Sequence, residues 1–232
     1  MKKYNLGYKR GSEEYVYGNL SGGSVVGKEL FYDSCRGAGG RKFLSDEVSF
    51  NYITPFTLSE FDERELKLRE FESLDGGPFA CQIYVFSIRM YNLLTQFNLM
   101  EHRVFDGRIL FGEQMIDVKC IQFLFCSVEN YFDFNYSTFK IKSSKLTINN
   151  VKNTFKTLPE LTAKYSKEYG MKLRWRFEKA VMKPSFREID MCYNGGNEFY
   201  ISERLKDALE EANFEGLQFK ECEVNFEYSD EQ

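Results

Sequence analysis

The chain of 232 residues contains a single histidine, His102, and no apolar stretch that approaches the roughly twenty residues needed to span a bilayer. Histidine is the one side chain whose ordinary pKa lies near neutral pH, so His102 is the only obvious proton shuttle. No Gly-x-Ser-x-Gly elbow and no local cysteine signature of a thiol protease accompanies it. The charged N-terminus, Met1–Gly7, is followed by no apolar run, so we expect no secretory signal and a cytoplasmic location.

The chain also lacks any Cys-x-x-Cys pair. Its six cysteines are widely and irregularly spaced, at positions 35, 81, 120, 126, 192 and 222. We expect them to be reduced, because this spacing is not that of a small disulfide-linked secreted domain. With one histidine, a zinc site would need thiolates from distant segments. We therefore expect neither a metal nor a cofactor.

The composition is that of an ordinary globular protein, with 43% hydrophobic and 28% charged residues. Residues 1–57 are rich in Gly, Tyr and Ser and contain short alternating pieces, which predict strands joined by turns. The charged stretch Ser59–Glu72 and the breaker Asp75–Pro78 mark the best boundary. The prediction is a strand-rich region over 1–75 and an α+β domain over 79–232, with one continuous domain as the alternative.

One short sequence unit occurs twice in the chain. Tyr84–Met90 and Phe199–Leu205 match at a spacing of 115 positions, as do Leu94 with Leu209 and Asn98 with Asn213. Each copy predicts an apolar strand, a serine that caps a helix, an amphipathic helix and a further strand. Internal duplication and shared capping rules both account for this match.

In the second copy, the 0, 3, 4, 7 stripe predicts one buried helical face formed by Leu205, Ala208, Leu209 and Ala212. Seven aromatic residues between Phe123 and Phe139 predict further strands, a helix is expected near 160–169, and Lys172–Phe177 alternates like a half-buried strand. The expected fold is α+β, with one mixed or mainly antiparallel sheet, packed helices and two similar strand-helix-strand units.

The charge is unevenly distributed. Residues 140–187 hold 13 Lys/Arg against 3 Glu, a charge of +10, whereas residues 188–232 hold 3 Lys/Arg against 13 Asp/Glu, a charge of −10. Either the two segments lie next to each other and neutralise one another, or at least one of them faces a charged macromolecule.

Two patterns resemble binding motifs without completing them. Gly22–Lys28 matches the first part of a phosphate-binding loop, but Glu29 stands where Ser or Thr should hold magnesium, which favours a plain glycine-rich turn. Lys172, Arg174 and Arg176 alternate with aromatic residues, as in some single-strand nucleic-acid binders. Alternation sends the charges and the rings to opposite faces and the pI is about 5.4, so nucleic acid is an unfavoured partner.

The segment Tyr200–Phe219 resembles the closing motif of the immunity protein eleven-like family, formerly carried as a domain of unknown function, in bacterial polymorphic and contact-dependent toxin systems. Cys120–Cys126 and Phe132–Ser137 extend the resemblance upstream, so it covers roughly the last half of the chain. A proline often follows the last aromatic residue in that family, where this chain has Lys220-Glu221.

The resemblance implies a small cytoplasmic protein that binds and neutralises a cognate bacterial toxin and has no catalytic residues. Physical reasoning then favours the acidic helix as the surface that meets a basic toxin of the nuclease type, through Glu203, Asp207, Glu210, Glu211 and Glu215. Two other function classes stay open: a small enzyme with an unrecognised active site, and a nucleic-acid-associated protein that uses residues 140–187.

Overall fold

The computed structural model of the chain describes residues 2–8, 20–26, 43–55, 70–74, 83–111, 113–124, 128–142, 147–152, 163, 167, 174–193, 199–214, 216–222 and 224–228. Strands predominate in these residues, and a few helices lie between them. The sheets are antiparallel or mixed. In this form, a sheet-rich chain with packed helices, the α+β prediction is confirmed. The expectation of a single sheet was wrong, because the described strands form a closed barrel and two four-stranded sheets.

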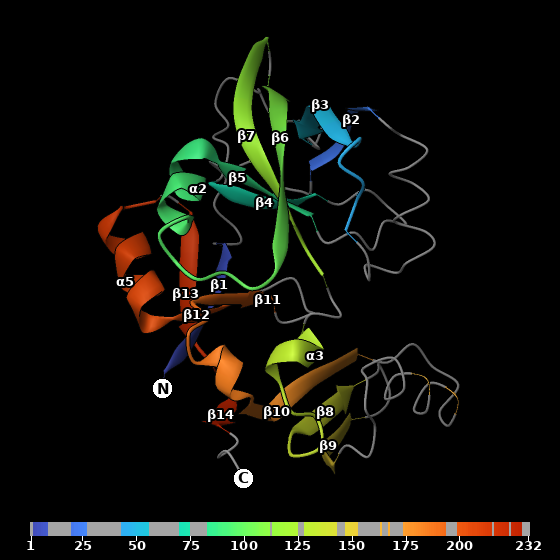
Figure 1. The fold of residues 1–232 in the computed structure, drawn as a ribbon, viewed down its shortest axis with the longest axis vertical. Coiled ribbons are helices and arrows are strands. Elements are labelled where there is room, and N and C mark those ends of the chain that lie inside the picture. The colour runs from blue at the N-terminus through green and yellow to red at the C-terminus, as the bar shows by residue number, and fades with distance from the viewer. Residues whose placement is uncertain are drawn as a thin grey trace.

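Six strands close into a barrel, in the order β2-β3-β6-β7-β5-β4, in the upper part of the molecule (Figure 1). Its strands are β2 (Leu20–Val26), β3 (Ser49–Pro55), β4 (Phe71–Leu74), β5 (Ile83–Ser87), β6 (His102–Phe111) and β7 (Gln114–Phe123). Helix α2 (Ile88–Leu94) follows β5 and packs on β5 and β7. Gly107 is required inside the barrel, because a Cβ there would lie 2.8 Å from Cys120 Sγ.

A second sheet has the order β11-β12-β1-β13. It consists of β11 (Met191–Tyr193), β12 (Phe199–Ser202), β1 (Lys3–Tyr8) and β13 (Leu217–Glu221). Helix α5 (Glu203–Glu211) follows β12 and packs on β12 and β1. The N-terminal strand β1 is therefore an inner strand that pairs with two strands from the C-terminal part of the chain.

A third sheet, at the lower end of Figure 1, has the order β14-β10-β8-β9. It contains β14 (Asn225–Tyr228), β10 (Arg174–Met182), β8 (Thr138–Lys142) and β9 (Thr147–Lys152), with α3 (Val128–Tyr131) and the 3-10 turn η3 (Pro184–Phe186) beside it. β10 and β14 are parallel, and Lys179 of β10 forms an ion pair with Glu227 of β14. The basic and acidic segments are thus neighbours along this contact.

Several local predictions can be compared with the structure. Strands β1, β2 and β3 confirm the strand-rich N-terminal reading, and Gly22–Val26 lies within β2 rather than in a turn. The predicted strand at Lys172–Phe177 is confirmed from Arg174 onward. The short alternating pieces expected as strands at Glu14–Tyr17 and Leu30–Tyr32, and the end of the glycine-rich pattern, Gly27, Lys28 and Glu29, lie outside the described residues.

Among the described residues of the aromatic run Phe123–Phe139, only the two ends lie in named strands. Phe123 ends β7 and Phe139 lies in β8, whereas Tyr131 ends α3, Phe132 forms an isolated β-bridge with Met182, and Phe134 lies in a turn. The strand prediction was wrong for the middle of the run, because Asp133 turns the chain there: its side chain accepts from Asn135 N and its carbonyl from Ser137 N.

Two further predictions fall largely on residues that are not described. In the range 160–169 the structure describes only Ala163 and Lys167, and both are helical. Most of the predicted boundary, Ser59–Pro78, is also outside the described residues, apart from β4 and Glu70. Four pairs of described strands cross this boundary, because β1 pairs with β12 and β13, β3 pairs with β6, and β4 pairs with β5. No helix in the described part of the chain has the length and apolar character to cross a bilayer.

Candidate functional site

The two predicted serine caps are confirmed. Ser87 precedes α2 and its Oγ accepts from Met90 N at 3.0 Å, while Ser202 precedes α5 and its Oγ accepts from Leu205 N at 3.1 Å. Beneath α5 the apolar stripe faces the sheet: Leu205 and Leu209 are buried, and the smaller Ala208 and Ala212 are half-buried. Both helices therefore begin where the sequence places them.

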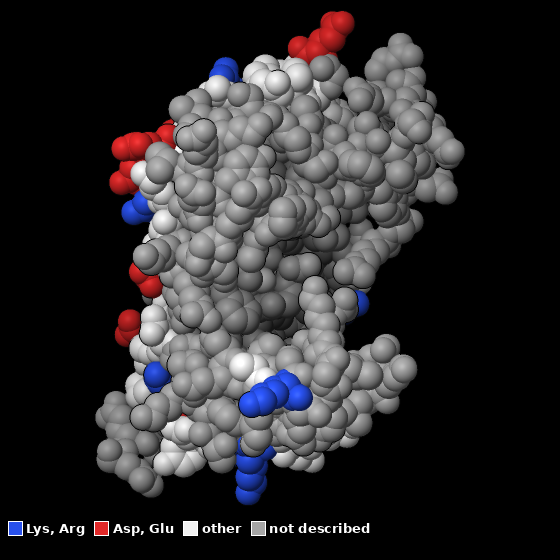
Figure 2. Space-filling model, turned by 90° about the vertical axis from the view of Figure 1, so that its right-hand side faces the viewer, with Lys and Arg blue, Asp and Glu red and all other residues white. Residues whose placement is uncertain are grey.

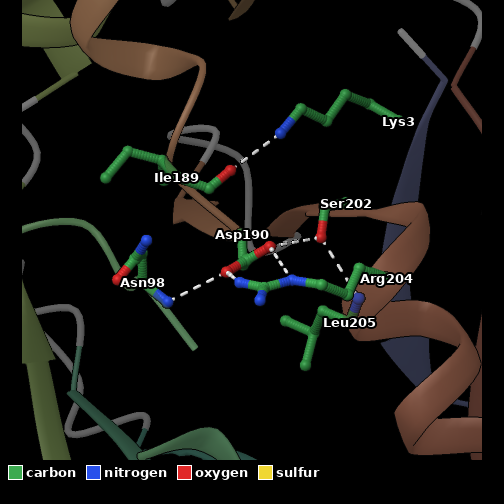
Figure 3. Close-up of polar contacts among 7 residues, drawn as sticks. All are labelled: Lys3, Asn98, Ile189, Asp190, Ser202, Arg204 and Leu205. Carbon is green, nitrogen blue, oxygen red and sulfur yellow. Dashed lines mark hydrogen bonds and ion pairs between the residues drawn. The ribbon is translucent and has the colours of Figure 1, made fainter. Parts of the chain in front are cut away.

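Asp190, which directly precedes β11, is the centre of a polar cluster at the start of α5 (Figure 3). Its Oδ1 accepts from Ser202 Oγ at 2.7 Å and from Arg204 Nε at 3.3 Å. Its Oδ2 accepts from Asn98 N at 2.9 Å and also pairs with the Arg204 guanidinium. Asp190 is 5% exposed, so these bonds hold a nearly buried carboxylate between two helices and a strand.

The charge state of Asp190 follows from two opposed effects. Burial alone would raise the pKa of its carboxyl group, but hydrogen bonds from Arg204, Ser202 and the Asn98 N–H, together with the charge of Arg204, outweigh it and lower the pKa below its ordinary value. Arg204 remains largely exposed, with 64% of its side chain accessible. The pair is therefore a buried anion with a solvated cation at its edge.

The Ser202 hydroxyl is occupied on both sides. It donates to Asp190 and accepts from Leu205 N, and Ser202 is 2% exposed. A nucleophilic serine needs a base that takes its proton, and a carboxylate whose pKa is held low is a weak base. This cluster therefore fixes the position of α5 and is unsuited to covalent chemistry at Ser202.

The first unit repeats this cluster around a different acid. Glu70 directly precedes β4, its carbonyl accepts from Ser87 N at 2.8 Å, and its side chain accepts from Ser87 Oγ. In the second unit Ser202 N donates to Asp190 O, also at 2.8 Å. Arg89 forms an ion pair with Glu70, as Arg204 does with Asp190, and Arg89 Nη1 lies 3.7 Å from Glu70 Oε1. Each unit thus contains an acid-serine-arginine cluster.

Each arginine also reaches the other unit. Arg89 lies over the Phe214 ring, 4.5 Å from its centroid, and donates to the carbonyl of Ala212 at the end of α5. Arg204 lies over the Phe97 ring at 5.0 Å, just past the end of α2. The contacts are reciprocal, and they hold α2 and α5 side by side at the left of Figure 1.

A buried lysine lies on the other side of Asp190. Lys3 is 2% exposed, donates to Ile189 O at 2.9 Å and lies 4.5 Å above the Phe186 ring. Burial lowers the pKa of Lys3 to about 8, against the opposing electrostatic influence of Cys192 and Asp190. Burial likewise raises the pKa of the Cys192 thiol to about 12, so this cysteine is a protonated core residue.

The acids predicted to bind a partner lie on the solvent side of α5. Glu203, Asp207, Glu210 and Glu211 are exposed, and Glu215 lies outside the described residues. We call these four the α5 acids. Lys206 pairs with both Asp207 and Glu210 on the same helix. Within the described residues, no α5 acid pairs with a base from 140–187.

Helix α2 has no such acids at the matching positions. At the positions that match the α5 acids, the first unit has Ile88 and Asn92 in α2, and Thr95 and Gln96 just past its end at Leu94. The two helices are otherwise capped and packed alike. The α5 acids are therefore not a requirement of this scaffold, since the equivalent helix forms without them.

His102 and the described cysteines give no further site. His102 begins β6, and its Nδ1 lies 2.8 Å from the carbonyl of Met100. Cys120 and Cys192 are buried free thiols, as predicted, and Cys222 Sγ donates to Asn5 Oδ1 at 3.2 Å, whereas Cys35, Cys81 and Cys126 lie outside the described residues. Among the residues that the structure describes, no three His, Cys, Asp or Glu side chains are grouped to hold a metal ion.

Sequence reasoning found the serines but missed their acids. Glu70 and Asp190 lie 17 and 12 residues before their serines, so they do not align at the common spacing. The available signal was Ser-x-Arg, present as Ser87-Ile88-Arg89 and Ser202-Glu203-Arg204. An arginine two residues after a cap can form a charge-assisted hydrogen bond with an acid, but its spacing does not indicate which acid.

Comparison with models of known protein families gives no match for this chain, and comparison with curated proteins gives none either.

Proposed function

We propose that this protein is a non-catalytic immunity protein, which binds a cognate bacterial toxin in the cytoplasm and neutralises it. The resemblance of Tyr200–Phe219 to the closing motif of immunity proteins supports this proposal. That segment includes α5 and most of β13, so the part of the chain that carries the resemblance also carries the α5 acids.

The observation that carries the proposal is the exposed acidic face of α5, which α2 lacks. Residues of one helix face that the fold does not need are candidates for recognition. From Glu203 to Glu211, four acids and two bases leave a charge of −2, and one base, Arg204, is already engaged by Asp190. The solvent face is therefore net negative.

Charge of this kind favours a basic partner. Complementary charge raises the rate of encounter and selects the partner, while buried contacts set much of the affinity. A nuclease-type toxin fits, because a surface that binds phosphates is itself basic. Figure 2 shows the face at the right-hand side of Figure 1, on which described acidic side chains lie at the top and, with basic ones between them, along the left edge, and further basic side chains lie at the lower end.

Growth protection tests the proposal directly. The toxin encoded beside this protein, co-expressed with it, should be harmless, and the two should purify as a stoichiometric complex. His102→Ala should protect equally well, because no catalytic step is involved. Loss of protection by a folded His102→Ala protein would indicate an enzyme, and binding of single-stranded nucleic acid in place of the toxin would favour the basic segment 140–187 as the functional surface.

A further inference from the structure

The two sheets beneath α2 and α5 have the same topology. Four barrel strands have the order β4-β5-β7-β6, and the second sheet has the order β11-β12-β1-β13. In each, the strand before the helix and the strand after it are both antiparallel to the one strand between them. The helix crosses over that middle strand and contacts it, which is β7 for α2 and β1 for α5.

The spacing of 115 residues extends from the helices to these strands. Val118 of β7 pairs with Ser87, and Lys3 of β1 pairs with Ser202, so Lys3 and Val118 are equivalent and lie 115 positions apart. The strands that follow the helices keep the same spacing. His102 of β6 pairs with Phe123 of β7, and Leu217 of β13 pairs with Tyr8 of β1. Leu217 lies 115 positions after His102, and Phe123 lies 115 positions after Tyr8.

In each of the two sheets, the middle strand comes from the other half of the chain. In chain order, β1 precedes β5, α2 and β6, and β7 precedes β12, α5 and β13. In space, β1 lies in the sheet of the second set and β7 in the sheet of the first. We propose that the chain is a tandem duplication of a unit of about 115 residues in which the two copies have exchanged their first strands, so that each copy is the binding partner of the other.

Shared capping rules do not account for this arrangement. They explain a serine before a helix and an amphipathic stripe after it, which are local features. They place no constraint on which distant strand fills the middle position, or on its register. The equivalent core positions also agree, since Leu6 and Ile121 are both fully buried, as are Met90 and Leu205.

The contacts between the copies are those of a two-fold interface. Around a two-fold axis, equivalent residues meet each other and other contacts occur in reciprocal pairs. Tyr84 and Phe199 are equivalent, and their ring centroids are 4.7 Å apart. Arg89 reaches the end of α5 and Arg204 reaches the end of α2. The two copies differ in one respect: Glu70 lies 17 residues before Ser87, whereas Asp190 lies 12 residues before Ser202. This is a difference in loop length and leaves the topology the same.

Hydrogen exchange of the full chain tests the strand exchange with matched variants. Leu6→Ala and Ile121→Ala remove equivalent side chains from β1 and β7. Leu6→Ala should raise amide exchange by about tenfold or more in β12, α5 and β13, and Ile121→Ala should do the same in β5, α2 and β6. Each substitution would thus loosen the sheet of the other half of the chain.

Two outcomes would overturn the proposal. One is faster exchange in the half of the chain that carries the substitution, and the other is an equal rise in both sheets with both variants. If either alanine variant does not fold, Leu6→Val and Ile121→Val make the same comparison with a smaller loss of volume.

A cut in the full chain gives a second readout. A protease site inserted in the turn between Phe111 and Gln114 separates the two copies after cleavage. The pieces should then elute together as one native particle and separate only in denaturant. Separation of the pieces without denaturant would overturn the proposal.

Discussion

Ser202 and Asp190 are joined twice, once through the main chain and once through their side chains. Ser202 N donates to Asp190 O at 2.8 Å, and Ser202 Oγ donates to Asp190 Oδ1 at 2.7 Å. The same hydroxyl also caps α5 by accepting from Leu205 N. One side chain therefore connects the end of β12, the residue before β11 and the first turn of the helix.

Removal of the cap hydroxyls should destabilise the fold in both units. Ser87→Ala should lower the free energy of unfolding by about 1 kcal/mol, the usual value of an N-cap. Ser202→Ala should cost about 2 kcal/mol, because its hydroxyl is buried and donates to a nearly buried carboxylate, whereas Ser87 and its bond to Glu70 are only partly buried. Urea denaturation of both variants provides the measurement, and unchanged midpoints would contradict the capping roles.

Asp190 should contribute stability that is lost in acid. Its pKa is lowered in the folded state, so the contribution is complete above the unfolded pKa of about 4 and disappears as the pH falls through the folded value. Asp190→Asn should be less stable than the parent by about 1.5–3 kcal/mol at pH 7. The gap should narrow below about pH 4. Glu211→Gln, at an exposed acid of α5, controls for the loss of one negative charge, and a gap that is independent of pH would contradict the prediction.

Stability from Lys3 should also rise with pH, but in an alkaline window rather than in acid. Its pKa is lowered to about 8 in the folded state, so between pH 8 and about 10.5 the unfolded chain keeps a proton that the folded chain has released. Stability from Lys3 therefore rises with pH in that window. Lys3→Met keeps the apolar stem without the charge, and the parent should gain up to about 3 kcal/mol relative to it between pH 7 and 10. Unfolding free energies of both proteins at pH 7 and pH 10 test this, and a constant difference between them would refute it.

The acids of α5 can be replaced by the residues that the first unit has at the matching positions. The triple variant Asp207→Asn, Glu210→Thr, Glu211→Gln should bind the toxin more slowly, and its association rate should lose most of its salt dependence. Each exposed substitution should change stability by only about 0.5 kcal/mol. Stopped-flow association at several salt concentrations measures the effect.

A matched control removes three exposed acids from the barrel instead. Asp46→Asn, Glu113→Gln, Asp117→Asn changes the net charge equally at positions away from α5. The association rate should fall less than in the α5 variant. If the α5 variant instead loses thermal stability and keeps its association rate, its acids serve to neutralise the basic segment within the molecule.

The local features of this fold were predictable from the sequence because short-range physics determines them. A capping serine and a 0, 3, 4, 7 stripe were enough to place α2 and α5. The position of β1 was not predictable, since nothing near Lys3 indicates that its partner is Ser202. Asp190 and Glu70 were missed for a related reason: the hairpins that bring them to their serines differ in length, which removes them from the common register.

The inner position of β1 also affects how the protein folds as it leaves the ribosome. β1 emerges well before both of its neighbours, β12 and β13, because strands β2 to β11 lie between them in the chain. The barrel strands β5, β6 and β7 can pair much earlier, since they are close together in the chain. Throughout synthesis of the second half, β1 therefore has both edges unpaired. We expect the second sheet to fold late and slowly, because its contacts are the most distant in sequence.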